Sequence, residues 1–181
     1  MAGKPAASTG GKGDAVDGII EDWRRERPEL DTDPLRVLGR LHRSFTRYQA
    51  LMAVPIDQYG LSLAGFDVLT ALRRAGAPYR LTAGELAASG LISSAGVTLR
   101  IDRLEKDGLI VRERDAKDRR VVYSRLTDEG LRVIDELFTE HLENERRMLA
   151  GLSERDCTQL ARLLAKLERS LAAAEPEDTE G

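Results

Sequence analysis

Residues 93–120 carry polar and basic side chains of the types that contact a nucleic acid. Residues 95–125 hold nine Lys and Arg against six Asp and Glu, although the whole chain has a net charge of −3. Because a phosphate backbone responds to the local surface charge more than to the overall charge, we expect this segment to bind double-stranded DNA. The candidate contacts are Ser93, Ser94, Thr98, Leu99, Arg103, Lys106, Lys117, Arg119 and Arg120.

Ser93 would cap a predicted helix over residues 94–107, and the next five of these candidates lie on that helix. On a helical wheel Val97, Ile101 and Leu104 share the buried face. The residues on the opposite face are Ala95, Leu99, Asp102, Arg103 and Lys106. The two serines and Thr98 lie near the N-terminus of this helix, where side chains usually reach phosphates and base edges. We expect Arg103 to read guanine and Leu99 to touch a thymine methyl group, the alternative being that Leu99 is an ordinary exposed leucine.

The remaining three lie in a charged turn that also contains Asp115 and Asp118. We expect Arg119 or Arg120 to enter the minor groove, with Asp118 orienting its neighbour through a charge-assisted hydrogen bond. The alternative is a solvated charged hairpin.

The cap and turn residues around these candidates indicate which elements position them. Thr82 and Glu85 form a capping box that opens a short helix, and Ser89-Gly90 marks a turn before the second helix. Two β-rich runs, 109–114 and 120–126, follow that helix directly and predict a hairpin, or wing. Residues 61–127 are therefore predicted to form a winged helix-turn-helix DNA-binding domain.

Long amphipathic helices make up the rest of the chain, so the predicted fold is mainly α with a small β wing. Their apolar stripes are larger than a small winged-helix domain can cover, which predicts a helical dimerisation region over 14–60 and 128–173 and hence a homodimer. The alternative is a monomer folded back on its own helices. Residues 1–13 and the acidic stretch 174–181 are expected to be disordered tails.

Several classes of protein are disfavoured. No apolar run approaches the roughly 18 residues of a membrane span, and the N-terminus lacks a signal-peptide pattern, so we expect a cytoplasmic protein without membrane contact. The single cysteine, Cys157, excludes an internal disulfide. The sequence has no glycine-rich phosphate loop and no nucleophile elbow, and His42 and His141 lack metal-ligand spacing. We expect no enzyme activity, metal or cofactor.

The segment from Leu81 to Gly130 resembles the MarR family of transcription regulators. The resemblance rests on RIDRLEKDGLI at 100–110 and on Asp118, Arg120, Leu126-Thr127 and Gly130 at their spacing in the wing and beyond it. It implies a ligand-responsive regulator that binds a palindromic operator as a homodimer, with repression as the default; activation stays open.

A tryptophan on an added N-terminal helix makes the chain similar to the urate-responsive members of that family. By position, the resemblance implies that Trp23, Asp67, Arg100 and Arg112 surround a small anionic effector, urate-like or tricarboxylate-like. The alternative for Trp23 is that it anchors its helix in the core, beside Ile19 and Ile20. Asp67 has the alternative of a structural ion pair with either arginine, and the arginines that of phosphate contact.

Two other functions remain open at this point. A winged helix can serve as a protein-interaction module, because fold alone does not define function. The second open function is a redox-responsive regulator that uses Cys157. Cys157 lies on an apolar stripe with Arg155 as its only basic neighbour, which favours inert packing of the thiol.

Overall fold

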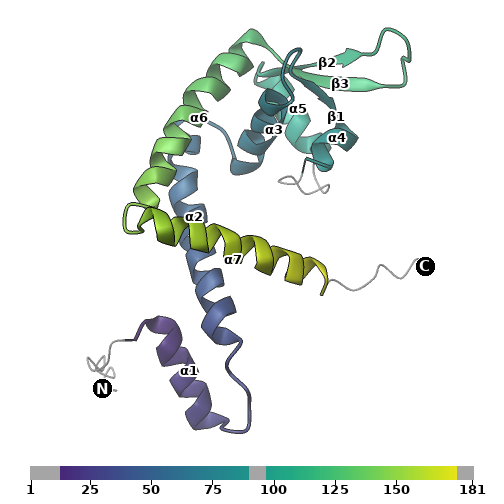
Figure 1. The fold of residues 1–181 in the computed structure, drawn as a ribbon. Coiled ribbons are helices and arrows are strands. Elements are labelled where there is room, and N and C mark those ends of the chain that lie inside the picture. The colour runs from purple at the N-terminus through teal and green to yellow at the C-terminus, as the bar shows by residue number, and fades with distance from the viewer. Residues whose placement is uncertain (1–12, 90–96, 175–181) are drawn as a thin grey trace, which may run out of the picture. The chain divides into compact units, whose positions relative to one another are not determined.

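The computed structural model describes residues 13–89 and 97–174 (Figure 1). The chain divides into two compact units at Leu51 and Met52, and each is described here by itself. Ser93 and Ser94 lie outside the described residues, as does nearly all of both predicted tails.

The N-terminal unit pairs helix α1 (Ala15–Glu26) with the first part of α2 (Leu35–Gln58). Asp14 caps α1 in a capping box with Asp17. Val16 and Ile20 are buried. A Cβ added to Gly39 of α2 would lie 3.1 Å from Cγ1 of Val16. Glycine on α2 thus lets the two helices approach closely.

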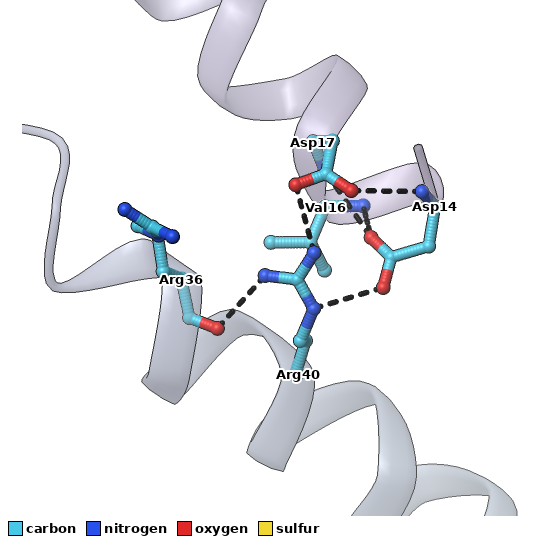
Figure 2. Close-up of polar contacts among 5 residues, drawn as sticks. All are labelled: Asp14, Val16, Asp17, Arg36 and Arg40. Atoms are coloured by element: carbon cyan, nitrogen blue, oxygen red, sulfur yellow. Dashed lines mark hydrogen bonds and ion pairs between the residues drawn. The ribbon is translucent and has the colours of Figure 1, made fainter. Parts of the chain in front are cut away.

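Arg40 ties these helices together, as Figure 2 shows. Its guanidinium donates to Asp14 at 2.9 Å and to Asp17 at 2.8 Å, and a third bond of 2.9 Å goes to the Arg36 carbonyl. The same two carboxylates that cap α1 therefore also anchor it to α2.

The second unit contains most of the core, and its described residues form five further helices. They are α3 (Leu63–Arg74), α4 (Ala83–Ala87), α5 (Val97–Lys106), α6 (Asp128–Met148) and α7 (Glu154–Ala172). Ser62, Thr82, Thr127 and Ser153 cap α3, α4, α6 and α7, and the capping box of Thr82 with Glu85 is the one that the sequence predicts. The core joins the end of α2 to α3–α6 and the sheet, with Ile56, Leu69, Leu72 and Ile134 fully buried.

A three-stranded antiparallel sheet of order β1-β3-β2 completes this unit. Strands β2 (Ile110–Arg114) and β3 (Val122–Leu126) form the expected hairpin, which projects beyond the helices in Figure 1. Strand β1 (Arg80–Thr82) was not predicted, because three residues are too short for an alternating pattern. It pairs with β3, and Arg80 stacks 4.3 Å above the ring of Tyr123. The fold is a mainly helical winged helix-turn-helix.

The start of α6 explains why Thr127 and Gly130 stand three residues apart. The Thr127 hydroxyl donates to the Gly108 carbonyl at 2.8 Å and accepts from the Gly130 amide at 3.0 Å. A Cβ on Gly130 would lie 1.9 Å from the Leu109 carbonyl oxygen. Only glycine allows α6 to begin against the end of the α5–β2 connection.

None of the described helices is both long and apolar enough to cross a membrane.

Candidate nucleic-acid interface and effector site

Helix α5 presents a polar face to solvent. Val97, Ile101 and Leu104 are buried, as the helical wheel predicts. The opposite face carries what we call the reading surface: Thr98, Leu99, Arg103 and Lys106, all exposed. Leu99 is 74% exposed, and the acid nearest to Arg103 is Asp107 at 3.9 Å. These side chains are free to meet a partner, and their contact with DNA stays a prediction.

The wing turn is built by its two aspartates. Asp115 accepts from the amides of Lys117 at 2.8 Å and Asp118 at 3.0 Å, and these bonds hold its pKa below the ordinary value. Asp118 binds both the amide and the guanidinium of Arg120, at 3.0 and 3.2 Å. The predicted orientation of a basic neighbour by Asp118 is thus present. Lys117, Arg119 and Arg120 all point into solvent, as minor-groove contact would require.

Arg112 on β2 forms ion pairs with two acids of α5, the predicted recognition helix. Its guanidinium forms ion pairs with Asp102 and with Glu105, and its amide donates to Glu105 at 3.2 Å. The bond to Asp102 raises the pKa of Arg112 most, partial desolvation opposes it, and Glu105 raises it further. No pattern in the sequence indicates this pairing, because it depends on how the wing folds back against α5.

Arg100 lies on a different flank of α5. It lines a hollow of about 160 Å³ with Gly60, Ser62 and Gly65 from the start of α3, and with Leu99 and Arg103 of the reading surface. Asp67 on α3 is half-buried: desolvation raises its pKa, and the charges of Arg100 and His141 partly oppose that rise. No hydrogen bond joins Asp67 to Arg100 or Arg112 in the described part of the chain.

Trp23 is 47% exposed on α1, so it does not anchor the N-terminal unit's core. The buried residues of this helix are Val16 and Ile20, while Ile19 is also exposed. Trp23 lines a shallow hollow with Ile19, Asp22 and Glu26, and the two carboxylates make this surface unfavourable for an anion by itself.

Within the second unit, no hydrogen bond or ion pair among the described residues joins Asp67, Arg100 and Arg112 to one another, so their common effector site stays a prediction. Asp67 and Arg100 influence each other electrostatically, Arg112 is held by Asp102 and Glu105, and Trp23 belongs to the other unit. Among the described residues, no cluster of His, Cys, Asp and Glu could hold a metal ion, and Cys157 is a half-buried free thiol on α7.

Comparison with known proteins gives this site its context. The profile of the MarR family matches residues 59–121, which include α3–α5 and the wing turn. The transcriptional regulator PecS of Dickeya dadantii is 39% identical over 156 residues, which cover 86% of this chain and 94% of PecS. The chain belongs to the MarR family. It is a transcriptional regulator of the winged helix-turn-helix type.

Two more MarR-type relatives bear on regulation. The transcriptional repressor MdtR of Bacillus subtilis is 32% identical over 138 residues, covering 76% of this chain and 87% of MdtR. The solved structure of BpsR from Bordetella bronchiseptica has a TM-score of 0.65 and 27% identity, covering 73% of this chain and 92% of BpsR. The DNA binding of BpsR is regulated by 6-hydroxynicotinic acid.

Proposed function

We propose that this MarR-family regulator acts as a homodimeric repressor that an organic anion releases from a palindromic operator. The observation that carries the DNA-binding part is the reading surface of α5, which is exposed beside a wing whose basic side chains point into solvent. Helices of this kind enter the major groove, and a basic wing fits the minor groove. The repressor assignment follows the name of MdtR.

The dimer is supported by apolar surface that the single chain leaves uncovered. Leu160, Leu163, Leu164 and Leu171 on α7 are each more than 40% exposed, and no residue of α7 is buried. Phe45, Leu51 and Val54 on α2 are at least half exposed. Apolar stripes of this length usually meet a second copy in a protein that binds two half-sites.

An anionic effector is supported by Arg100 and by the example of BpsR, whose regulator is a carboxylic acid. A carboxylate paired with Arg100 would lie in the hollow that also contains Leu99 and Arg103, so it would compete with DNA for the reading surface. Asp67 would repel the same anion and favour a shift of α5 against α3. The urate-like effector and the contribution of Trp23 belong to this proposal.

An electrophoretic shift with the intergenic DNA upstream of the gene tests the proposal. We expect a specific shift that millimolar urate, 6-hydroxynicotinate or citrate abolishes, and that Arg100→Gln makes insensitive to the effector. Six to ten phosphate contacts predict a slope of log affinity against log salt of about −5 to −9. Absence of any specific shift would instead favour a protein-interaction module.

A further inference from the structure

The recognition helix carries two acids beside its basic side chains. Between Val97 and Lys106, Asp102 and Glu105 are its only carboxylates, and their side chains are 53% and 37% exposed. A duplex presents about one negative charge per 1.7 Å of its axis, so bare carboxylates on this helix would oppose DNA binding.

Arg112 engages both of them at once. One guanidinium nitrogen pairs with Asp102 and another with Glu105, while the Arg112 amide donates to the second Glu105 oxygen at 3.2 Å. The partners come from the wing strand and the recognition helix, so the contact also fixes the wing against α5.

We propose that Arg112 is a charge mask: a positioning residue that neutralises Asp102 and Glu105 and holds them toward the wing, away from the DNA phosphates. Arg112 then acts on DNA through these two carboxylates rather than by touching DNA or an effector. The inference rests on DNA binding by this chain and is independent of any effector.

The alternative roles of Arg112 fit its surroundings less well. An effector anion would have to displace two carboxylates that already occupy the guanidinium. Arg100, the other arginine assigned to that effector, lies against the start of α3 and not against Asp102 or Glu105. A phosphate contact would likewise compete with both acids. In the described structure, the ion-pair partners of the Arg112 guanidinium are the two acids that the proposal says it neutralises.

The mask makes a prediction that separates charge from contact. In Arg112→Gln the two carboxylates lose their counter-charge, and DNA affinity should fall roughly tenfold at low salt. Adding Asp102→Asn and Glu105→Gln removes the charges that Arg112 masks. The triple variant should therefore recover to within about threefold of the wild type.

Arg125→Gln is the matched control. Arg125 lies on the neighbouring strand β3, its side chain is 35% exposed against 33% for Arg112, and its partner at 2.7 Å is Glu113 on the wing, not an acid of α5. It loses the same charge from the same sheet, but it uncovers no carboxylate on the recognition helix. Its DNA affinity should change less than that of Arg112→Gln.

The experiment measures affinity by fluorescence anisotropy for the upstream intergenic duplex and for a random duplex of equal length. The mask predicts the same fold loss on both duplexes, and a loss that shrinks as salt rises from roughly 50 to 300 mM because repulsion is screened. Circular dichroism establishes that each variant is folded at the assay temperature.

Each contrary result overturns the inference. A triple variant as weak as Arg112→Gln would show a phosphate contact or a purely structural link, and wild-type affinity in Arg112→Gln would show that the carboxylates need no mask. Arg112→Lys keeps the charge and should stay near the wild type, so a loss as large as that of Arg112→Gln also contradicts the mask. A wild-type chain that binds neither duplex refutes the proposed function together with this inference.

Discussion

Asp67 lies half-buried on α3, where desolvation raises the pKa of its carboxyl group and the charges of Arg100 and His141 only partly offset that rise. The surroundings of this carboxyl group thus disfavour its ionised form. It contributes an electrostatic cost to the folded state and would repel an anion bound at Arg100.

Replacing Asp67 with Asn should remove both effects. Because the folded pKa is raised, the folded state binds a proton before the unfolded chain does, and the cost is fully present only above the folded pKa. We expect Asp67→Asn to raise the Tm by a few degrees at pH 7–8, with the gain disappearing as pH falls toward the unfolded value. An anionic effector should bind roughly tenfold more tightly.

Thermal unfolding across pH and calorimetric titration with 6-hydroxynicotinate measure these changes. Asp107→Asn is the control for stability, because Asp107 is an exposed acid just beyond α5 that lines the same hollow as Arg100. A pH-independent change in Tm would argue for altered packing instead of a removed charge.

At the scale of elements, the join between β2 and α6 depends on close backbone approach. Gly130→Ala places a Cβ 1.9 Å from the Leu109 carbonyl oxygen, so one of two backbone segments must move. We expect a loss of about 3 kcal/mol in the free energy of unfolding, measured by urea denaturation. Gly84→Ala on α4 meets nothing within 4 Å and should gain about 0.5 kcal/mol. Equal effects at the two glycines would contradict the close-approach explanation.

Helix α1 should release from α2 in acid. The hydrogen bond from Arg40 lowers the pKa of Asp17, and bonds from backbone amides and Arg40 outweigh desolvation to lower that of Asp14. A lowered folded pKa gives stabilisation that is complete above the unfolded value of 3.8 and is lost as pH falls through the folded value. Docking of α1 should therefore persist at pH 5 and weaken below about pH 4.

The chain's single tryptophan, Trp23, lies on α1 and reports this release through its fluorescence anisotropy. Arg40→Gln should lower the anisotropy already at pH 7, while far-UV circular dichroism shows the rest of the chain folded. Arg25→Gln is the control, since Arg25 pairs with Asp22 inside α1 at 2.6 Å and not with α2. An Arg40→Gln protein with wild-type anisotropy would contradict the anchoring role of Arg40.

At the scale of the whole molecule, uncovered apolar surface couples assembly to DNA binding. Leu160→Lys with Leu164→Lys places two charges on the exposed leucine stripe of α7. We expect a monomer by sedimentation, and a loss of operator affinity on the order of 100-fold because the two half-sites are no longer bound by one particle. Thr158→Lys with Ala165→Lys adds the same charges to the opposite face of α7 and should stay dimeric. A dimeric leucine variant would place the interface elsewhere.

Whether a feature could be predicted depends on how many residues along the chain separate the groups that cause it. Caps act over three or four residues, so the capping box of Thr82 and Glu85 marked a helix start that the structure confirms. The helical wheel separated the buried face of α5 from its exposed face for the same reason. The effector set stays a prediction, because its members come from three helices and a strand and no local pattern brings them together.

The sequence by itself determined the order of the helices and the wing hairpin, the family and the exposed basic character of the recognition helix and wing, since these depend on local spacing and composition. Tertiary structure alone decided that Arg112 binds Asp102 and Glu105, that Ile20 and not Trp23 is buried on α1, and that Gly130 lies against Leu109. Each of these outcomes depends on which of several available partners packing brings within reach, and a linear pattern does not encode that choice.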